Sequence, residues 1–351
     1  MSATGPRQVF EGFRERVLRG EWGAPEALRS GGVTIELPCA PPGVPRRFDD
    51  GAEFHAHTAA SRAALPVRFE EFRDVRVHET ADPEVIVVEY AMAGTVTTTG
   101  RPAAAPFVLV LRVRDGRVRL WREYQPALAV AEALGALDAL LAAARGLPAP
   151  APDPALSPWS PDGPVPGAGG DPNGPVAGPA GDPNGPMAGP AGGPNGPMAS
   201  PAGGPNGPVA GPRAVYERIL RAALDGSADD YADLYDAEAI LEFPFAAPGL
   251  PRSLHGQEAI RSHLRAAMGG ALRIEEFRGV VVHETADPEV IVAEHAIVGT
   301  ATASGLPCSI ANLVVLTVRD GRIVRQRDYL DVLAAAAAAG RLPDPAARRP
   351  A

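Results

Sequence analysis

The ten residues HETADPEVIV occur twice in the chain without a change, at positions 78–87 and again at 283–292. Each copy lies inside a longer similar segment, the first beginning near Glu70 and the second near Glu275. The match continues without a gap through VRDGRVRLWREY in the first half and VRDGRIVRQRDY in the second. Chance does not produce such identity, so the chain carries an internal duplication, and a repeat has to be recognised before local structure is interpreted. The duplication predicts two copies of one fold.

The rest of the chain divides around this repeat. With 351 residues, of which 45% are hydrophobic, each half can bury a core of its own. We predict domain 1 over 6–146 and domain 2 over 212–343. The intervening segment, 147–211, contains an eleven-residue unit of the type GDPNGPVAGPA, repeated four times from Gly170. Proline, glycine and small residues cannot bury enough surface to offset the entropy of ordering, which predicts a disordered linker with a reach of roughly 45 Å.

Each domain begins with helical periodicity and continues with strands. PRQVFEGFRERVLRG and PRAVYERILRAALDG carry one apolar face each, and GAEFHAHTAASRA, ADDYADLYD and GQEAIRSHLRAAM predict further helices. A strand is predicted at AILEFPF, and four β-type runs complete each domain. Asp-Gly pairs at 115–116 and 320–321 predict tight type I′ hairpins, and the repeated decamer closes the preceding hairpin. This order predicts an α+β fold in which a curved antiparallel sheet wraps around about three helices and forms a cone with an apolar pocket.

Charge, cysteine content and motifs exclude several classes of function. The net charge of −9 argues against a nucleic-acid or anionic-membrane partner. Cys39 and Cys308 have no metal-ligand spacing around them and do not form a disulfide framework. The first residues lack an apolar targeting segment, and no apolar stretch is long enough to span a bilayer, so we expect a cytoplasmic protein. Without a phosphate loop, a dinucleotide fingerprint or an HExxH motif, we expect no cofactor and no metal.

Several motifs resemble a known family. FPFAAPGLPRSLHGQEAIRSHLRAA, VHETADPEVIVAEH and VRDGRIVRQRDYL resemble the SnoaL-like branch of the nuclear-transport-factor-2-like superfamily. The pattern ETxDP, followed by DG[KR]IxRxR[ED][FY] and a final Leu/Ala-rich helix, is most similar to the phenazine-biosynthesis A/B proteins. The resemblance covers nearly all of 6–137 and 212–342. It implies cone-shaped domains, whereas the reaction stays open because this fold hosts cyclases, isomerases, dehydratases and non-catalytic binders.

The strongest catalytic candidates are the acids near the end of the last strand, Asp328 in RQRDY and Glu123 in LWREY. The resemblance implies an acid/base residue at this position. A carboxyl group among apolar side chains has a raised pKa and can exchange protons near neutral pH. Pairing counted from a two-residue turn places Asp328 with Gln326, Val324, Leu313 and Val315, and Glu123 with Trp121, Val108 and Val110. The alternative for Asp328 is an ion pair with Arg325 or Arg327.

A third catalytic candidate is His263 on the third helix of domain 2, where the resemblance implies a pocket histidine opposite the acid. It could equally lie on the helix surface. The ungapped match puts Thr58 at this position in domain 1, with His57 one residue earlier. The tyrosines of the second helix could donate to an oxyanion or belong to the core. His78 and His283 flank a turn, and we expect them to be exposed. The predicted substrate contacts are Tyr231, Tyr235, Glu294, His295, Gln326, Trp121, Tyr90 and His57.

Three functions remain compatible with these residues. The first is a small-molecule isomerase, cyclase or dehydratase of secondary metabolism that works by general acid–base catalysis. The second is a module that binds a small hydrophobic or aromatic metabolite without converting it. The third is a pseudo-dimer in which one half has lost its site, because the halves differ at Thr58/His263, Tyr90/His295, Phe107/Asn312 and Trp121/Gln326. We expect domains 1 and 2 to pair with each other within one chain, since the linker raises their effective concentration.

Overall fold

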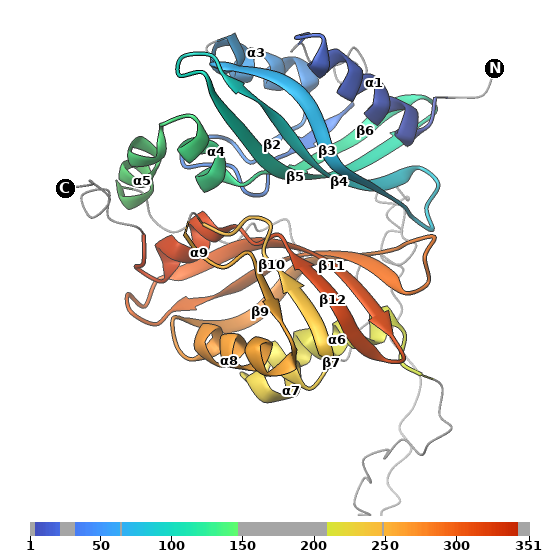
Figure 1. The fold of residues 1–351 in the computed structure, drawn as a ribbon, viewed down its shortest axis with the longest axis vertical. Coiled ribbons are helices and arrows are strands. Elements are labelled where there is room, and N and C mark those ends of the chain that lie inside the picture. Colours follow the sequence, from blue (N-terminus) through green and yellow to red (C-terminus); the bar gives the residue numbers. More distant parts are fainter. Residues whose placement is uncertain (1–3, 22–31, 64, 147–208, 248, 343–351) are drawn as a thin grey trace, which may run out of the picture.

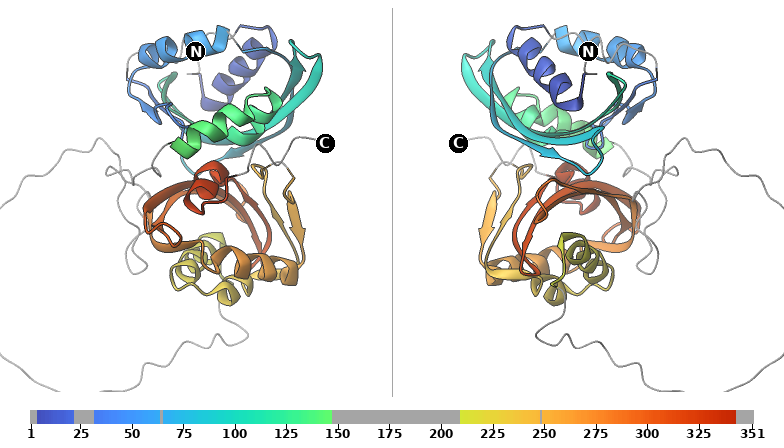
Figure 2. Two further views of the ribbon diagram at one scale, coloured as in Figure 1. Left: turned by 90° about the vertical axis from the view of Figure 1, so that its left-hand side faces the viewer. Right: turned by 90° about the vertical axis from the view of Figure 1, so that its right-hand side faces the viewer.

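The computed structural model describes residues 4–21, 32–63, 65–146, 209–247 and 249–342. They form two six-stranded sheets of the same topology, ordered β2-β1-β6-β5-β4-β3 and β8-β7-β12-β11-β10-β9. In Figure 1 the two sheets face each other across the middle of the molecule, and the opening helices of each domain cover the far side of its sheet. The side views in Figure 2 show each sheet curving around these helices. The predicted α+β class with two cone-shaped domains is confirmed. The predicted linker lies, from 147 to 208, outside the described residues.

The described residues of domain 1 form two helices inside its sheet and two shorter helices after it. The helices that the sheet wraps are α1 (Pro6–Leu18) and α3 (Gly51–Ala63). The strands are β1 (Thr34–Glu36), β2 (Arg47–Phe48), β3 (Val67–Glu79), β4 (Val85–Val96), β5 (Arg101–Arg114) and β6 (Arg117–Tyr124). The chain then forms α4 (Ala127–Ala133) and α5 (Leu137–Gly146). Pro6 at the start of α1 suits a first helical turn, where its missing N–H is not needed.

In domain 2 the described residues form three helices inside the cone and one after the sheet. Its helices are α6 (Pro212–Leu224), α7 (Ala228–Ala232), α8 (Gln257–Met268) and α9 (Val332–Ala338). Its strands are β7 (Tyr235–Glu242), β8 (Ser253–His255), β9 (Leu272–Glu284), β10 (Val290–Ala301), β11 (Pro307–Arg319) and β12 (Arg322–Asp328). The second helix is shorter than predicted, so Tyr235 begins a strand instead of lying on that helix. Each sheet also contains one parallel pairing, β1 with β6 and β7 with β12.

The Asp-Gly hairpins form as predicted, but a bulge follows each of them. Asp115 and Asp320 have φ values of 52° and 49°, and the glycines after them 71° and 74°, as a type I′ turn requires. Beyond the second turn the register shifts between Thr317 and Val318, which gives β12 one extra residue. Asp328 therefore lies opposite Val314, and Gln326 opposite Leu316. The predicted faces for Asp328 and Glu123 were wrong by one residue, because Glu123 likewise lies opposite Leu109.

Each sheet is buried on both faces, which explains the long apolar runs of its central strands. The concave faces enclose separate cores, for example around Leu109 and Leu111 in domain 1 and around Val314 and Leu316 in domain 2. The convex faces contribute to one shared cluster, formed by Cys39, Val85, Val87, Val108, Val110, Tyr124, Phe245, Val292, Ala311, Leu313, Val315 and Tyr329. The two domains therefore contact each other through the backs of their sheets.

The repeated decamers meet at this contact. Thr80 and Thr285 form an antiparallel bridge. Ala81 N donates to Glu284 O, and Ala286 N donates to Glu79 O, both at 2.8 Å. The two copies therefore make equivalent hydrogen bonds to each other, as in an interface with twofold symmetry.

No helix in the parts of the chain that the structure describes is long and apolar enough to cross a membrane.

Candidate functional site

A row of polar side chains crosses the concave face of the domain 2 sheet. Directly opposite residues of antiparallel strands share a face, so His295 on β10 and Asn312 on β11, which are paired, lie on one side of the sheet. Gln326 and Asp328 on β12 lie opposite Leu316 and Val314, both members of the domain 2 core. The structure therefore brings the predicted site residues His295, Gln326 and Asp328 to one face of the sheet and adds Asn312. We call this group, with the tyrosines described below, the domain 2 polar cluster.

Asp328 is the acid of this cluster. Burial raises its pKa to about 6, although a hydrogen bond from the side chain of Asn312 acts in the opposite direction. Its Oδ1 atom is buried and has no hydrogen-bond partner among the described residues. The alternative of an arginine ion pair is not what the structure shows, because Arg325 pairs with Glu242 and Arg327 with Glu89. The residue as a whole is of intermediate burial, while its Oδ1 atom is enclosed within domain 2.

Three tyrosines surround this acid. The Tyr235 hydroxyl donates to Gln326 Oε1 at 2.7 Å, and Gln326 Nε2 donates to the Tyr231 hydroxyl at 3.2 Å. Burial and the nearby charge of Asp328 raise the pKa of Tyr231 to about 12. Burial likewise raises the pKa values of Tyr235 and Tyr216, with a contribution from Asp328 in each case. These hydroxyls stay protonated at neutral pH, and they are hydrogen-bond donors close to a carboxylate.

His295 is a neutral member of the cluster. Burial lowers its pKa to about 4, and its Nδ1 lies 2.7 Å from the hydroxyl of Tyr216 on α6. The edge of its ring packs against Phe277 at a centroid distance of 5.1 Å. In the tautomer in which Nδ1 accepts from Tyr216, the neutral imidazole carries its proton on Nε2 and can donate from there without adding a charge.

The same positions in domain 1 are filled by aromatic rings. Phe107 stands where domain 2 has Asn312, Trp121 where it has Gln326, and Tyr90 where it has His295. Tyr90 stacks on Phe107 and on Phe72, with centroid distances of 5.6 and 5.4 Å. The further rings of this aromatic cluster are Phe10 and Phe13, and Phe13 contacts Trp121 at 5.0 Å. Apolar rings therefore occupy the space that polar side chains line in domain 2.

Glu123 is satisfied within this aromatic cluster. The Tyr90 hydroxyl donates to its Oε1 at 2.6 Å, and Gln125 Nε2 donates to its Oε2 at 3.2 Å. Both carboxylate oxygens thus have a partner, in contrast to Asp328, whose Oδ1 has none in the described parts of the chain. The two acids at matching positions of the last strands therefore differ in the chemistry open to them.

The structure places three of the predicted site residues away from both clusters. His263 is exposed on α8, where its ring lies 5.0 Å from that of Phe243. His57 is exposed on α3 beside Phe48. Glu294 points to the opposite face of β10 from His295, because neighbouring side chains of a strand alternate between faces. Its carboxylate accepts from Arg122 Nη1 and from the Tyr124 hydroxyl, both at 2.9 Å. Glu294 therefore belongs to the contact between the domains.

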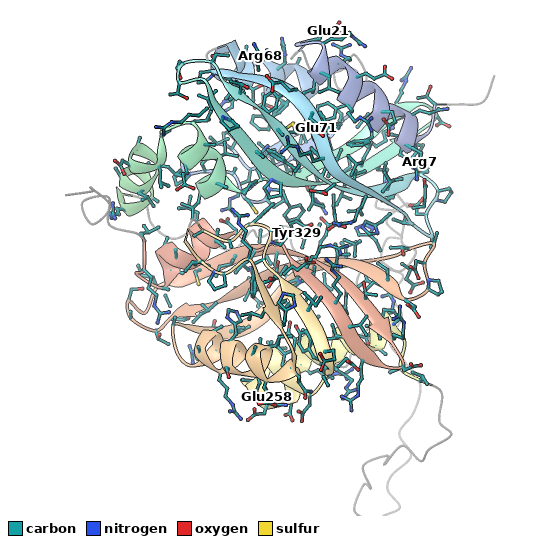
Figure 3. The ribbon with its side chains drawn as sticks, viewed as in Figure 1. Arg7, Glu21, Arg68, Glu71, Glu258 and Tyr329 are labelled. Carbon is teal, nitrogen blue, oxygen red and sulfur yellow. The ribbon has the colours of Figure 1, made fainter. Side chains whose placement is uncertain are left out.

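The sequence analysis missed two ion-pair clusters in this contact. In the first, Glu89 accepts from Arg327 Nε at 2.5 Å and from Nη2 at 2.8 Å, and also from the Tyr329 hydroxyl. Figure 3 shows Tyr329 between the two sheets. His78 completes the cluster, with its Nε2 2.7 Å from Glu89 Oε1. The second is the matching set of Glu294, Arg122, Tyr124 and His283.

These clusters correct the prediction for the decamer histidines. His78 and His283 are not exposed: only 14% and 13% of their side-chain surface is accessible. Burial would raise the pKa values of Glu89 and Glu294, but the partners of each lower them to about 2. The signal in the sequence was the equal spacing in both halves of a histidine, a glutamate, an arginine and a tyrosine, which a contact with twofold symmetry requires.

Other features of the described residues lie apart from Asp328. A surface hollow in domain 1 is lined by Glu70, Arg73 and Pro102 among others, and one in domain 2 by Asp229, Arg265 and Met268. Cys39 and Cys308 are buried free thiols. Within the described ranges, no three His, Cys, Asp or Glu side chains are placed to hold a metal ion.

Comparisons with known proteins agree with this architecture. The model of the SnoaL-like domain matches twice, at residues 10–121 and 216–326, so the chain belongs to the SnoaL-like family as a tandem pair. A segment is 37% identical to an uncharacterized PhzA/B-like protein of Pseudomonas aeruginosa, over 32% of this chain and 77% of that protein. The uncharacterized YesE protein of Bacillus subtilis is 32% identical to a segment that covers 31% of this chain and 74% of the YesE protein. A solved structure of a phenazine biosynthesis-related protein of P. aeruginosa also matches, with 18% identity and a TM-score of 0.30. The match covers 38% of this chain and 82% of that protein.

Proposed function

We propose that domain 2 is a cofactor-independent general acid–base catalyst that isomerises, cyclises or dehydrates a small hydrophobic or aromatic metabolite of secondary metabolism. The observation that carries the proposal is Asp328, a carboxyl group with a pKa of about 6 and a buried Oδ1 without a partner among the described residues. A carboxylate with such a pKa can take a proton and return it near neutral pH. The free Oδ1 is the atom to which a bound molecule would give its proton.

The neighbours of Asp328 suit the charge that forms in such a step. When a proton leaves carbon next to a carbonyl group, negative charge develops on the carbonyl oxygen, and nearby donors stabilise it. Tyr231 keeps its proton at neutral pH, and its hydroxyl is already oriented by Gln326. Asn312 and the neutral His295 supply further donors without adding a positive charge. Asp328 would then return the proton to a different atom of the substrate.

Domain 1 is proposed as the half that does not react. Both oxygens of Glu123 already have partners, and aromatic rings occupy the neighbouring positions. A substrate would have to displace this packing before it reached the acid, whereas polar side chains stand at the matching positions beside Asp328, whose Oδ1 has no described partner. The remains of a former site in domain 1 would then support the fold of domain 2.

The test is a thermal-shift screen of the full chain against cyclic ketones, enones and aromatic polyketide or phenazine precursors, with product analysis on every compound that binds. We expect a compound that the wild type converts and that Asp328→Asn binds without converting. Glu123→Gln is the matched variant in domain 1, and it should convert the compound like the wild type. Binding by all three proteins with no product from any of them would instead identify a binding module.

We also propose that the two domains pair within a single molecule. The support is the pair of buried ion clusters and the shared apolar cluster between the sheets. The full chain should therefore have the mass of one copy, 36.3 kDa, in light scattering after size exclusion. A stable particle of twice this mass at micromolar concentration would contradict the proposal and point to pairing between chains.

A further inference from the structure

We infer that domain 1 positions the carboxyl group of Asp328, through the ion pair that Glu89 makes with Arg327 across the domain contact. The inference rests on the proposed role of Asp328 as the reacting group. It assigns a task to the half of the molecule that lacks a free acid. Glu89 would be a positioning residue, because it lies on the convex side of the sheets and does not face the domain 2 polar cluster.

The contact is well suited to hold a strand. Glu89 and Arg327 are only 2% and 8% exposed, and two hydrogen bonds of 2.5 and 2.8 Å join the guanidinium group to both carboxylate oxygens. Two parallel bonds between an arginine and a carboxylate fix orientation as well as distance. The Tyr329 hydroxyl donates to the same carboxylate. Glu89 therefore holds two side chains of domain 2 at once.

The two side chains that Glu89 holds are the immediate neighbours of Asp328. Side chains alternate between faces along a strand, so Arg327 and Tyr329 face domain 1 while Asp328 faces the concave side. Asp328 is also the last residue of β12, and the backbone just beyond it stays joined to β11, where Tyr329 N donates to Leu313 O at 2.8 Å. Anchors on both sides of it fix the backbone that carries the carboxyl group. A displacement of about 1 Å at a reacting group is enough to reduce a rate severely.

Both domains contain a glutamate that binds an arginine and a tyrosine of the other domain, but among the described residues only Asp328 of the two flanked acids has an oxygen without a partner. Glu294 likewise accepts from Arg122 and Tyr124, which flank Glu123, but Arg122 gives it one bond instead of two and donates its Nε to Glu36. Glu123 has additional partners inside its own domain, Tyr90 and Gln125, whereas Asp328 is bonded by Asn312 alone and keeps Oδ1 free of described partners. The position of Asp328 therefore depends on the domain contact more than that of Glu123 does.

The experiment follows the side-chain carboxyl signal of Asp328 by carbon NMR in the full-length protein labelled at aspartate, with the signal assigned from its loss in Asp328→Asn. We compare the wild type, Glu89→Gln and the double variant Glu89→Gln/Arg327→Gln. Loosening of β12 hydrates the carboxyl group and favours its ionised form, so the titration midpoint should fall by about one pH unit in both variants. With a converted substrate in hand, kcat should fall about tenfold while KM stays within about twofold.

The double variant separates positioning from charge and from folding. Glu89→Gln leaves the buried Arg327 charge unpaired, which both destabilises the protein and lowers the midpoint by its field. The double variant removes that charge, so a midpoint that returns to the wild-type value there would overturn the inference. An unchanged midpoint in Glu89→Gln would overturn it as well. Glu84→Gln, which removes only the more exposed pair with Arg114, is the control and should titrate like the wild type.

The NMR titration does not depend on turnover. If no compound is converted by the wild type, the proposed catalytic function fails, but the titration still decides whether domain 1 positions Asp328. If a compound is converted and Glu89→Gln leaves both kcat and the midpoint unchanged, the catalytic function stands and the positioning role fails.

Discussion

Replacing Glu89 by glutamine is expected to lower the free energy of unfolding by about 3–5 kcal/mol, which is the usual cost of removing one partner from a buried ion pair. Arg327 would keep its charge in a position that is only 8% exposed, and among the described residues its guanidinium group forms no ion pair with a second carboxylate. Glu294→Gln should cost less, because Arg122 also pairs with Glu36 at 2.5 Å and would retain that partner. Glu89→Gln should therefore lower the free energy of unfolding more than Glu294→Gln, because only Arg122 retains a second ion-pair partner.

Urea unfolding at pH 7.5, followed by circular dichroism, measures both losses. Glu238→Gln is the control, since Glu238 is exposed on β7, and its effect should lie within about 0.5 kcal/mol of zero. Losses of less than about 1 kcal/mol for Glu89→Gln would show that the pair does not hold the domains together in solution.

Acid should weaken the same contact. The pKa values of Glu89 and Glu294 are lowered to about 2 in the folded protein, from an ordinary value of 4.5. Their stabilisation is complete above the ordinary value and is lost as the pH falls from about 4.5 towards 2. The stability gap between the wild type and Glu89→Gln should therefore narrow over this range.

Replacing Asp328 by asparagine is expected to have the opposite sign, a gain in stability at neutral pH of up to about 3 kcal/mol. Burial raises the pKa of Asp328 from 3.8 to about 6, so the folded protein holds this proton more tightly than the unfolded chain does. The ionised carboxylate thus costs stability, and this cost develops between pH 4 and 6 and is complete above that range. Asparagine carries no charge, and its amide group can donate to the buried Oδ1 of Asn312, which lacks a described partner.

Unfolding free energies of the wild type and Asp328→Asn at pH 7.5 and at pH 3.5 check this sign. The difference should be present at the higher pH and shrink to about 0.5 kcal/mol or less at the lower one. Asp225→Asn, at the exposed end of α6, is the matched control and should change stability little at either pH. A neutral or destabilising effect of Asp328→Asn at pH 7.5 would mean that the ionised carboxylate is solvated or paired in the folded protein, against the burial that raises its pKa.

The sequence predicted the two domains and their class, because duplication, strand patterning and the Asp-Gly turns can all be recognised without long-range contacts. It misjudged which side chains accompany Asp328, since one extra residue in β12 shifts the pairing and nothing local marks that bulge. The predicted place of Glu294 in the substrate pocket was also wrong, and the cause is different. The central strands are apolar on both faces, and only the other domain decides that a glutamate on the convex face finds an arginine there.

The identity of the two decamers has a consequence for how the halves choose partners. Thr80 pairs with Thr285, and each half places a histidine, a glutamate, an arginine and a tyrosine at matching positions of the contact between the domains. Such a surface is complementary to itself, so a half does not distinguish by these contacts between its neighbour in the chain and a second copy of its own kind. Covalent connection makes the choice instead. The covalent connection allows the interiors of the two domains to diverge, with Phe107 in one and Asn312 at the matching position of the other. A substitution in the contact between the domains must still fit the unchanged residue that faces it.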